Sequence, residues 1–128
     1  MRTNILFAGV LILFLAGLTA CGPDRRDTLR SRLIGGDPER GKAALYRYGC
    51  GACHTISGVA GAHGRVGPHL TDVAQRWYLA GMIPNTPDNM VAWIMNPQRI
   101  NPDTIMPFLN VPENDARDMV AYLYGSSE

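Results

Sequence analysis

The feature that most constrains this chain is the pentapeptide Cys50-Gly51-Ala52-Cys53-His54. Residues three and four positions apart share one face of a helical turn, so both thiols and the imidazole should point the same way. Each sulfur can then form a thioether with one vinyl group of a haem, while His54 ligates the iron. The motif therefore predicts one covalently attached haem c per chain, bound through Cys50 and Cys53, with His54 as an axial ligand.

A C-x-x-C segment has a second interpretation, because the same spacing occurs in redox-active dithiols and their disulfides. In this chain His54 follows Cys53 directly, and no thioredoxin-like alternation of strands and helices surrounds the motif. Both observations favour haem attachment over a Cys50–Cys53 disulfide.

Residues 1–20 have the pattern of an export signal. Met1-Arg2 is positively charged, and residues 5–18 are almost wholly apolar. A permanent membrane-spanning helix needs ~20 apolar residues, so this run is short for an anchor. We expect residues 1–20 to be a cleaved signal peptide of the lipoprotein type.

The small residues before Cys21 resemble a bacterial lipobox, in which the cysteine is lipidated and becomes the first mature residue. Two alternatives remain: Cys21 merely follows an ordinary cleavage site, or the segment stays as an uncleaved anchor. Every version exports the domain, which would lie on the periplasmic or extracytoplasmic face of a bacterial membrane.

Residues 21–34 are expected to form a flexible basic tether. The stretch from Gly22 to Leu33 contains four arginines and two aspartates, a formal charge of +2, which suits a segment beside anionic lipids. A solvated linker without a binding role fits the same composition. The globular domain then covers residues 35–128, and a chain of 128 residues leaves no room for a second core.

The pattern of caps and apolar positions predicts an all-α domain of short helices and long loops. Helices are expected over residues 38–48, 72–76, 87–96 and 113–124, with N-caps at Asp37, Thr71 and Thr86 for the first three. Residues 56–68 and 96–112 read as loop or extended chain, and no strand pattern is visible. Loops this long need another source of core, which a buried haem would supply.

The second axial ligand decides what such a haem can do. A methionine there suits electron transfer, whereas an open position would allow ligand binding or catalysis. The candidate side chains are Met82, Met90, Met95, Met106, Met119, His63 and His69. Met90, Met95 and Met119 fall on expected helices, where methionine is usually core. Met106 lies in an extended loop able to cover the distal face and is our predicted ligand, with Met82 as its main rival.

From Gly35 onward the chain resembles a class I cytochrome c, and it is particularly similar to the cytochrome c domain fused to subunit II of caa3-type haem–copper oxidases. The resemblance is carried by three segments in the family's order and spacing: Gly67-Pro68-His69-Leu70, Trp93-Ile94-Met95-Asn96-Pro97 and Asp103-Thr104-Ile105-Met106-Pro107. It covers nearly all of the mature chain and implies the class I cytochrome c fold.

The resemblance also implies roles for single residues. The Pro68 carbonyl would accept the imidazole N–H of His54, Trp93 would lie against the haem near the axial sulfur, and Met106 would be that sulfur. Arg76 and Thr104 match residues that bind haem propionates. Three of these residues have plainer alternatives: Arg76 could be a surface arginine, Trp93 a core residue and Thr104 a turn residue. Gly41 and Tyr122 fit the family's crossing of first and last helices, while His69 and Pro112 depart from its usual residues.

Charge and composition limit the classes of partner. Residues 35–128 contain seven Lys or Arg and nine Asp or Glu, a formal charge of −2, and Lys42 is the single lysine there. Long-range steering should therefore be modest, and docking should use apolar side chains such as Pro107-Phe108-Leu109. We expect no nucleic-acid partner and no small-molecule substrate, because there is neither a long basic run nor an acid–base constellation.

Together, the lipobox-like segment at Cys21, the haem motif and the resemblance predict a membrane-anchored monohaem c-type cytochrome that carries single electrons in a respiratory chain to a terminal oxidase or reductase. Its redox partners would be a haem–copper oxidase or a quinol-oxidising complex. The alternative is a permanently bound haem c subunit of a larger oxidase or dehydrogenase. A gas- or peroxide-handling haem protein is a third possibility, and it requires an open or labile sixth position.

Overall fold

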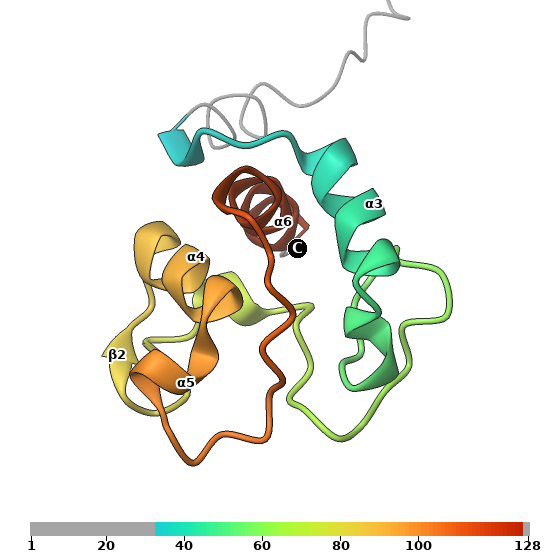
Figure 1. The fold of residues 1–128 in the computed structure, drawn as a ribbon. Helices are drawn as coiled ribbons and strands as arrows, with labels where there is room; N and C mark the ends of the chain where they lie inside the picture. The colour runs from blue at the N-terminus through green and yellow to red at the C-terminus, as the bar shows by residue number, and fades with distance from the viewer. Residues whose placement is uncertain (1–32, 127–128) are drawn as a thin grey trace, which may run out of the picture.

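The computed structural model describes residues 33–126, which form a mostly helical domain (Figure 1). The expected signal peptide, Cys21 and the tether up to residue 32 lie outside the described residues. In chain order the elements are α3 (Pro38–Arg47), η2 (Cys50–Ala52), η3 (Val73–Gln75), β1 (Tyr78–Leu79), β2 (Ile83–Pro84), α4 (Pro87–Met95), α5 (Pro97–Ile100) and α6 (Glu113–Gly125).

Two of the predicted helices begin and end almost where their caps place them. The Asp37 side chain accepts a hydrogen bond of 2.9 Å from the backbone N–H of Arg40 at the start of α3. Thr86 does the same for Asn89 at the start of α4, at 3.2 Å, and a proline occupies the first turn of both helices. Helix α4 ends before Pro97, which lacks the N–H needed to continue it.

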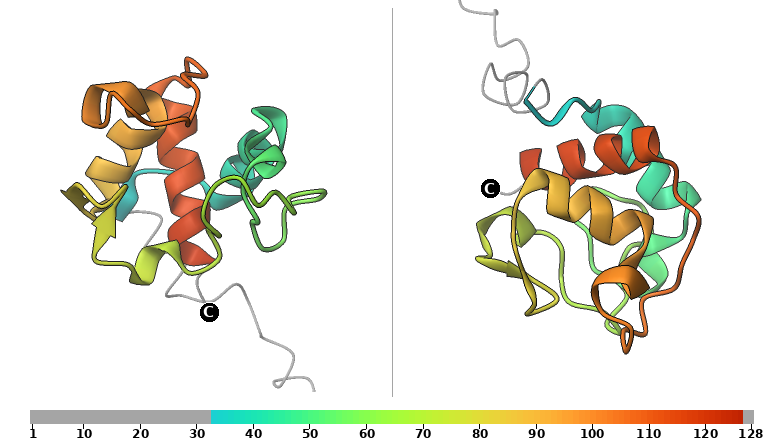
Figure 2. Two further views of the ribbon diagram at one scale, coloured as in Figure 1. Left: turned by 90° about the horizontal axis from the view of Figure 1, so that it is seen from below. Right: turned by 60° about the vertical axis from the view of Figure 1, so that its left-hand side comes forward.

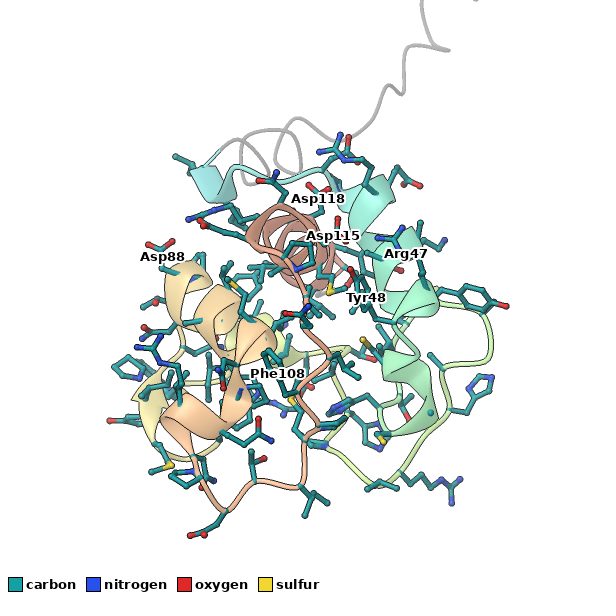
Figure 3. The ribbon with its side chains drawn as sticks, in the orientation of Figure 1. Arg47, Tyr48, Asp88, Phe108, Asp115 and Asp118 are labelled. Atoms are coloured by element: carbon teal, nitrogen blue, oxygen red, sulfur yellow. The ribbon has the colours of Figure 1, made fainter. Side chains whose placement is uncertain are left out.

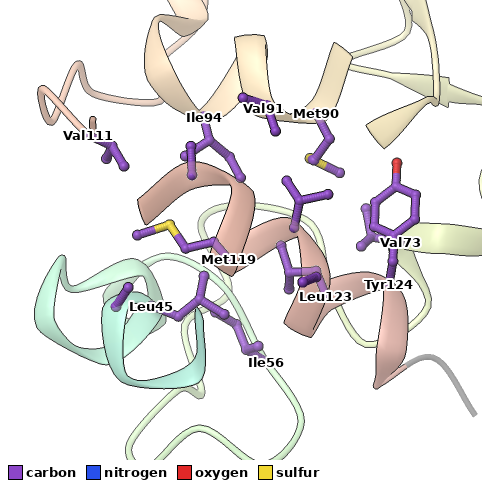
Figure 4. Packing of buried hydrophobic residues seen from close by; sticks show 14 of the residues in the cluster. Leu45, Ile56, Val73, Met90, Val91, Ile94, Val111, Met119, Leu123 and Tyr124 are labelled. Carbon is purple, nitrogen blue, oxygen red and sulfur yellow. The ribbon is translucent and has the colours of Figure 1, made fainter. Parts of the chain in front are cut away.

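The core is arranged around α6, which buries one apolar stripe against its neighbours. Ala116, Met119, Val120 and Leu123 are each no more than 1% exposed. Helices α3 and α4 pack against α6 from two sides, with Leu45 from α3 and residues 90, 91 and 94 from α4 (Figure 4).

Helices α3 and α6 cross at a glycine, as expected for Gly41. A Cβ on Gly41 would lie 2.9 Å from the backbone nitrogen of Met119 and closer still to the carbonyl oxygen of Asp118. Only a residue without a side chain permits this approach. At the other end of the interface, Arg47 and Tyr48 both donate 2.8 Å hydrogen bonds to Asp115 (Figure 3).

A carboxylate links the same two helices. Asp118 on α6 is only 5% exposed and accepts hydrogen bonds from the Arg40 guanidinium, at 2.7 and 2.9 Å, and from the Asp37 backbone N–H, at 2.6 Å. Burial raises the pKa of Asp118, but these donors outweigh it, so the net pKa lies below the ordinary value.

The structure corrects three local predictions. A two-stranded antiparallel hairpin pairs Tyr78 with Pro84 and Leu79 with Ile83, where no strand was expected. Its turn residues Ala80 and Gly81 have φ of 51° and 70°, the conformation of a tight hairpin turn. The helix expected over residues 72–76 is only a 3-10 turn, Val73–Gln75, whose N-cap is Asp72 rather than Thr71, and Asp72 makes no side-chain capping hydrogen bond. Finally, α5 interrupts the segment expected to be extended.

The described chain begins beside α6 and away from the loop that joins α5 to α6. Ile34 is buried, and its carbonyl accepts a 3.3 Å hydrogen bond from Arg117 of α6. The α5–α6 loop lies at the opposite end of the domain (Figure 1 and the right-hand view of Figure 2). None of the helices within residues 33–126 has the length and apolar content that crossing a bilayer requires.

Candidate functional site

The Cys50–His54 segment is a single helical turn. Gly49, with φ of 70°, lies in the left-handed region between α3 and this turn. The backbone N–H of His54 then donates to the Cys50 carbonyl at 3.0 Å. Both thiols are unpaired. A helical turn carries residues 50, 53 and 54 on one face, and no disulfide joins Cys50 to Cys53.

The electrostatics of Cys50 also differ from those of a reactive dithiol. Burial raises the pKa of the Cys50 thiol, and the neighbouring Cys53 adds to the effect. Redox-active C-x-x-C pairs instead lower a cysteine pKa to stabilise the thiolate. A half-buried thiol with a raised pKa has less thiolate character than the reactive cysteine of such a pair.

The His54 ring is held from two directions. Its Nδ1 lies 2.8 Å from the Pro68 carbonyl oxygen, and because a carbonyl can only accept, Nδ1 carries the proton. A Cβ on Gly67 would lie 2.6 Å from Nδ1 and 2.9 Å from Nε2, so the ring packs flat against a backbone without a side chain. The deprotonated Nε2 is thus the ring nitrogen that would be available to ligate a metal.

The segment carrying these contacts is tied to the turn by its backbone. The Gly67 N–H donates to the Cys53 carbonyl at 2.8 Å, and the Leu70 N–H donates to the Thr55 carbonyl at 2.9 Å. Sequence reasoning had assigned Pro68 through the family resemblance but no role to Gly67. The Gly67-Pro68 pair is visible in the sequence, but the need for a glycine there depends on the His54 ring, which lies fourteen residues before Pro68.

These residues fit a covalently bound haem. The two thiols would attach the haem, and the imidazole, with Nε2 free and Gly67 behind the ring, would be an iron ligand. Among the described residues, no group of three or more His, Cys, Asp or Glu side chains could hold a metal ion directly.

Met106 lies half-buried in the α5–α6 loop. Its N–H donates to the Thr104 hydroxyl oxygen at 3.2 Å, and its carbonyl accepts from Gln98 Nε2 at 2.7 Å. The main rival, Met82, is 54% exposed beside the hairpin turn. Met90 and Met119 are core residues, as predicted. Axial ligation by Met106 stays a prediction that this geometry favours.

The three expected haem neighbours are found in different settings. Trp93 is half-buried at the edge of the core, as a residue lining a haem would be. Arg76 donates to Asp72 at 2.8 Å and to the His69 carbonyl, and its guanidinium holds the pKa of Asp72 below the ordinary value. Thr104 accepts from Met106 and keeps its own hydroxyl proton to donate. Their contacts with haem stay predictions.

Asn85 is a site residue that sequence reasoning missed. Its Nδ2 donates to the Val73 carbonyl at 2.6 Å and to the Arg76 carbonyl at 2.8 Å, and its Oδ1 accepts from the Tyr124 hydroxyl. It thereby fastens the segment that carries Arg76 to helix α6. No local pattern could have indicated this, because one partner lies 39 residues away.

Exposed apolar side chains flank Met106. Ile105, Phe108 and Leu109 are 81%, 54% and 38% exposed. Phe108 lies near the centre of the view in Figure 3, beside α5. The exposure agrees with the expected Pro107-Phe108-Leu109 contact surface, whose use by a partner stays a prediction.

Comparison with known proteins adds independent findings. Residues 38–127 match the family model described as Cytochrome c. The chain is also similar to cytochrome c oxidase subunit 2 of Alkalihalophilus pseudofirmus, with 31% identity over 85 residues, which cover 66% of this chain and 24% of that protein. The chain thus spans about a quarter of the length of that relative. No solved structure matches it.

Proposed function

Because the chain belongs to the cytochrome c family, we propose that it is a single-haem electron carrier, anchored to a bacterial membrane by lipid on Cys21, that passes electrons to a terminal oxidase or reductase. Family membership itself implies covalently bound haem and electron transfer. The anchor, the haem count and the partner belong to the proposal.

One observation carries the proposal: the His54 ring is locked between Gly67 and the Pro68 carbonyl. Haem, when bound, supplies an iron that alternates between ferrous and ferric states. The Pro68 carbonyl, by accepting from Nδ1, makes the imidazole a stronger donor and fixes its orientation. A ligand that does not move between the two states lowers the reorganisation that each electron transfer requires.

The opposite side of the site is assigned to Met106. A thioether ligand stabilises ferrous iron and raises the reduction potential, and it denies the sixth position to oxygen or peroxide. Met106→Ala should abolish the methionine-to-ferric-iron absorption band, and Met82→Ala, the matched control, should retain it. A band that survives in Met106→Ala would show that the ligand assignment is wrong.

The partner is proposed from the relative. That protein is named as an oxidase subunit, which supports a haem–copper oxidase as the electron acceptor, with a quinol-oxidising complex as the source. The same name supports the alternative, a permanently bound haem c subunit of a larger oxidase or dehydrogenase. Transient redox complexes bury little area, whereas permanent interfaces are large.

Affinity purification from native membranes, followed by haem staining, separates the two. A carrier should be isolated alone in mild detergent at moderate salt. Stoichiometric co-purification of oxidase or dehydrogenase subunits through repeated washing would instead establish the subunit alternative.

The anchor has its own test. The proposal predicts that the native protein fractionates with membranes and carries the added mass of a diacylglyceryl group on Cys21. Cys21→Ala should abolish that modification, while Cys50 and Cys53 continue to carry haem. An unmodified Cys21 in membrane-bound native protein would show that the anchor is of another kind.

A further inference from the structure

Within the described residues, the side chain of Gln98 makes a single hydrogen bond, and its acceptor is Met106. Gln98 Nε2 donates to the Met106 carbonyl at 2.7 Å. The amide oxygen, Oε1, is buried and has no donor among the described residues. The Met106 carbonyl can only accept, so the amide must turn its Nε2, and not Oε1, toward Met106. The hydrogen bond to Met106 therefore fixes the orientation of the Gln98 amide.

Gln98 lies on a well-anchored helical turn. It lies in α5, directly after Pro97, whose side chain is among the most completely buried in the domain. The Asn96 side chain caps this short helix by accepting from the Arg99 N–H at 3.2 Å, and the Asn101 N–H closes it on the Pro97 carbonyl at 2.9 Å. A side chain from such an element can hold a neighbouring loop in place.

The α5–α6 loop (residues 101–112, the Met106 loop) makes few other hydrogen bonds within the described chain. In the second hydrogen bond at Met106 its N–H donates to the hydroxyl oxygen of Thr104, a residue of the same loop whose own N–H donates to the Asn101 carbonyl at the end of α5, at 3.1 Å. No hydrogen bond joins residues 107–111 to the rest of the described chain. The next firm point is Val111, which is only 4% exposed. Within the described chain, the direct hydrogen bond from a helix side chain to Met106 is therefore the one that Gln98 donates.

We propose that Gln98 is a positioning residue that keeps the Met106 thioether over the iron. This inference rests on the proposed function, in which Met106 is the sixth ligand. Gln98 favours the closed state of the loop over an open one in which the thioether has left the iron. A ligand that competes for the sixth position binds only the open state, so its apparent affinity measures that equilibrium.

The test uses the full haem-loaded chain in the ferric state. Gln98→Leu removes the donor but nearly preserves the volume of the side chain. The matched control is Gln75→Leu, because Gln75 is exposed in η3 and its side chain makes no hydrogen bond in the described structure. Free imidazole is the competing ligand, and the methionine-to-ferric-iron absorption band reports Met106 directly.

One hydrogen bond corresponds to a change of roughly threefold to tenfold in such an equilibrium. Gln98→Leu should therefore bind imidazole roughly threefold to tenfold more tightly than the wild type, with loss of the band at correspondingly lower imidazole concentration. Gln75→Leu should match the wild type. Gln98→Asn, which keeps the amide but is one methylene too short to reach, should behave as Gln98→Leu and serves if the leucine variant does not accumulate.

Two failures are distinguishable. If Met106→Ala keeps the band, Met106 is not the ligand, and the inference falls with that part of the proposed function. If Met106→Ala loses the band but Gln98→Leu binds imidazole as the wild type does, the inference alone is overturned. A lowered Tm in Gln98→Leu with unchanged imidazole affinity has the same meaning, because a purely structural role would leave the iron site untouched.

Discussion

Gly67 offers the sharpest test of how the chain holds its histidine. In Gly67→Ala the new Cβ would lie 2.6 Å from His54 Nδ1 and 2.9 Å from Nε2, whereas ordinary carbon contacts need about 3.5 Å or more. Either the ring or the backbone must retreat by about 1 Å to relieve this contact. Such a movement would stretch the 2.8 Å bond between Nδ1 and the Pro68 carbonyl beyond hydrogen-bonding range.

The expected cost has two parts. Overpacking of this kind costs about 1–3 kcal/mol, and the lost hydrogen bond adds about 1 kcal/mol. Gly67→Ala should therefore lower the free energy of unfolding by about 2–4 kcal/mol. The reduction potential should also rise, because an imidazole without its acceptor is a weaker donor and favours ferric iron less.

Urea unfolding of the haem-loaded protein measures the first effect, and a spectroelectrochemical titration measures the second. Gly125→Ala is the matched control: Gly125 also has an ordinary φ, but its Cβ would meet no atom within 4 Å. It should leave the potential unchanged and keep stability within about 1 kcal/mol. A Gly67→Ala protein with wild-type potential and stability would refute the assignment of Gly67 as the cradle of the ring.

Three further predictions concern the surrounding fold. Gly41→Ala places a Cβ 2.9 Å from the Met119 nitrogen and closer to the Asp118 carbonyl, so a clash of about 3 kcal/mol outweighs a helix-propensity gain of about 1 kcal/mol; urea unfolding should show a net loss of about 2 kcal/mol. The pKa of Asp118 is lowered in the folded state, so its contribution to stability is present above its ordinary value of 3.8 and disappears as pH falls through the folded value. The Asp118→Asn protein should therefore be less stable at neutral pH and lose less further stability in acid. If the free energy of unfolding falls equally with decreasing pH in the variant and the wild type, this prediction is wrong. Burial raises the pKa of Tyr124 from 10.0 to about 12, so folded Tyr124 keeps its proton where the unfolded chain has released it, and stability falls as pH rises from about 10 to about 12. Tyr124→Phe should lack that component, of about 2 kcal/mol, in unfolding curves recorded across this range.

Local signals accounted for much of the fold. Asp37-Pro38 and Thr86-Pro87 place the starts of α3 and α4 because capping depends on residues adjacent in sequence. The hairpin escaped notice because strands of two residues show no alternation, and its turn uses Ala80 at positive φ, a residue that is no turn signal. Helix α5 is a single turn held by tertiary burial of Pro97, which periodicity cannot reveal.

The candidate site divides in the same way. Cys50, Cys53 and His54 are recognisable because their chemistry lies within one turn, and Pro68 came from the resemblance of its segment to the family. Gly67, Asn85 and Gln98 went unassigned because each acts through a partner brought near only by the fold. A glycine that must be small and an amide that reaches a distant carbonyl look ordinary in the sequence.

The position of Ile34 affects how the protein would meet its partners. Ile34 is fastened to α6, at the end of the domain opposite the Met106 loop. With Cys21 lipidated as proposed, the twelve steps of chain to Leu33 could reach at most about 40 Å. The domain would then stay within that distance of the bilayer surface, with its Met106 loop free to face away from the membrane. Confinement near the bilayer would raise the local concentration of the carrier around any partner in the same membrane. A domain of formal charge −2 lacks strong long-range charge attraction, and the short tether would compensate for this.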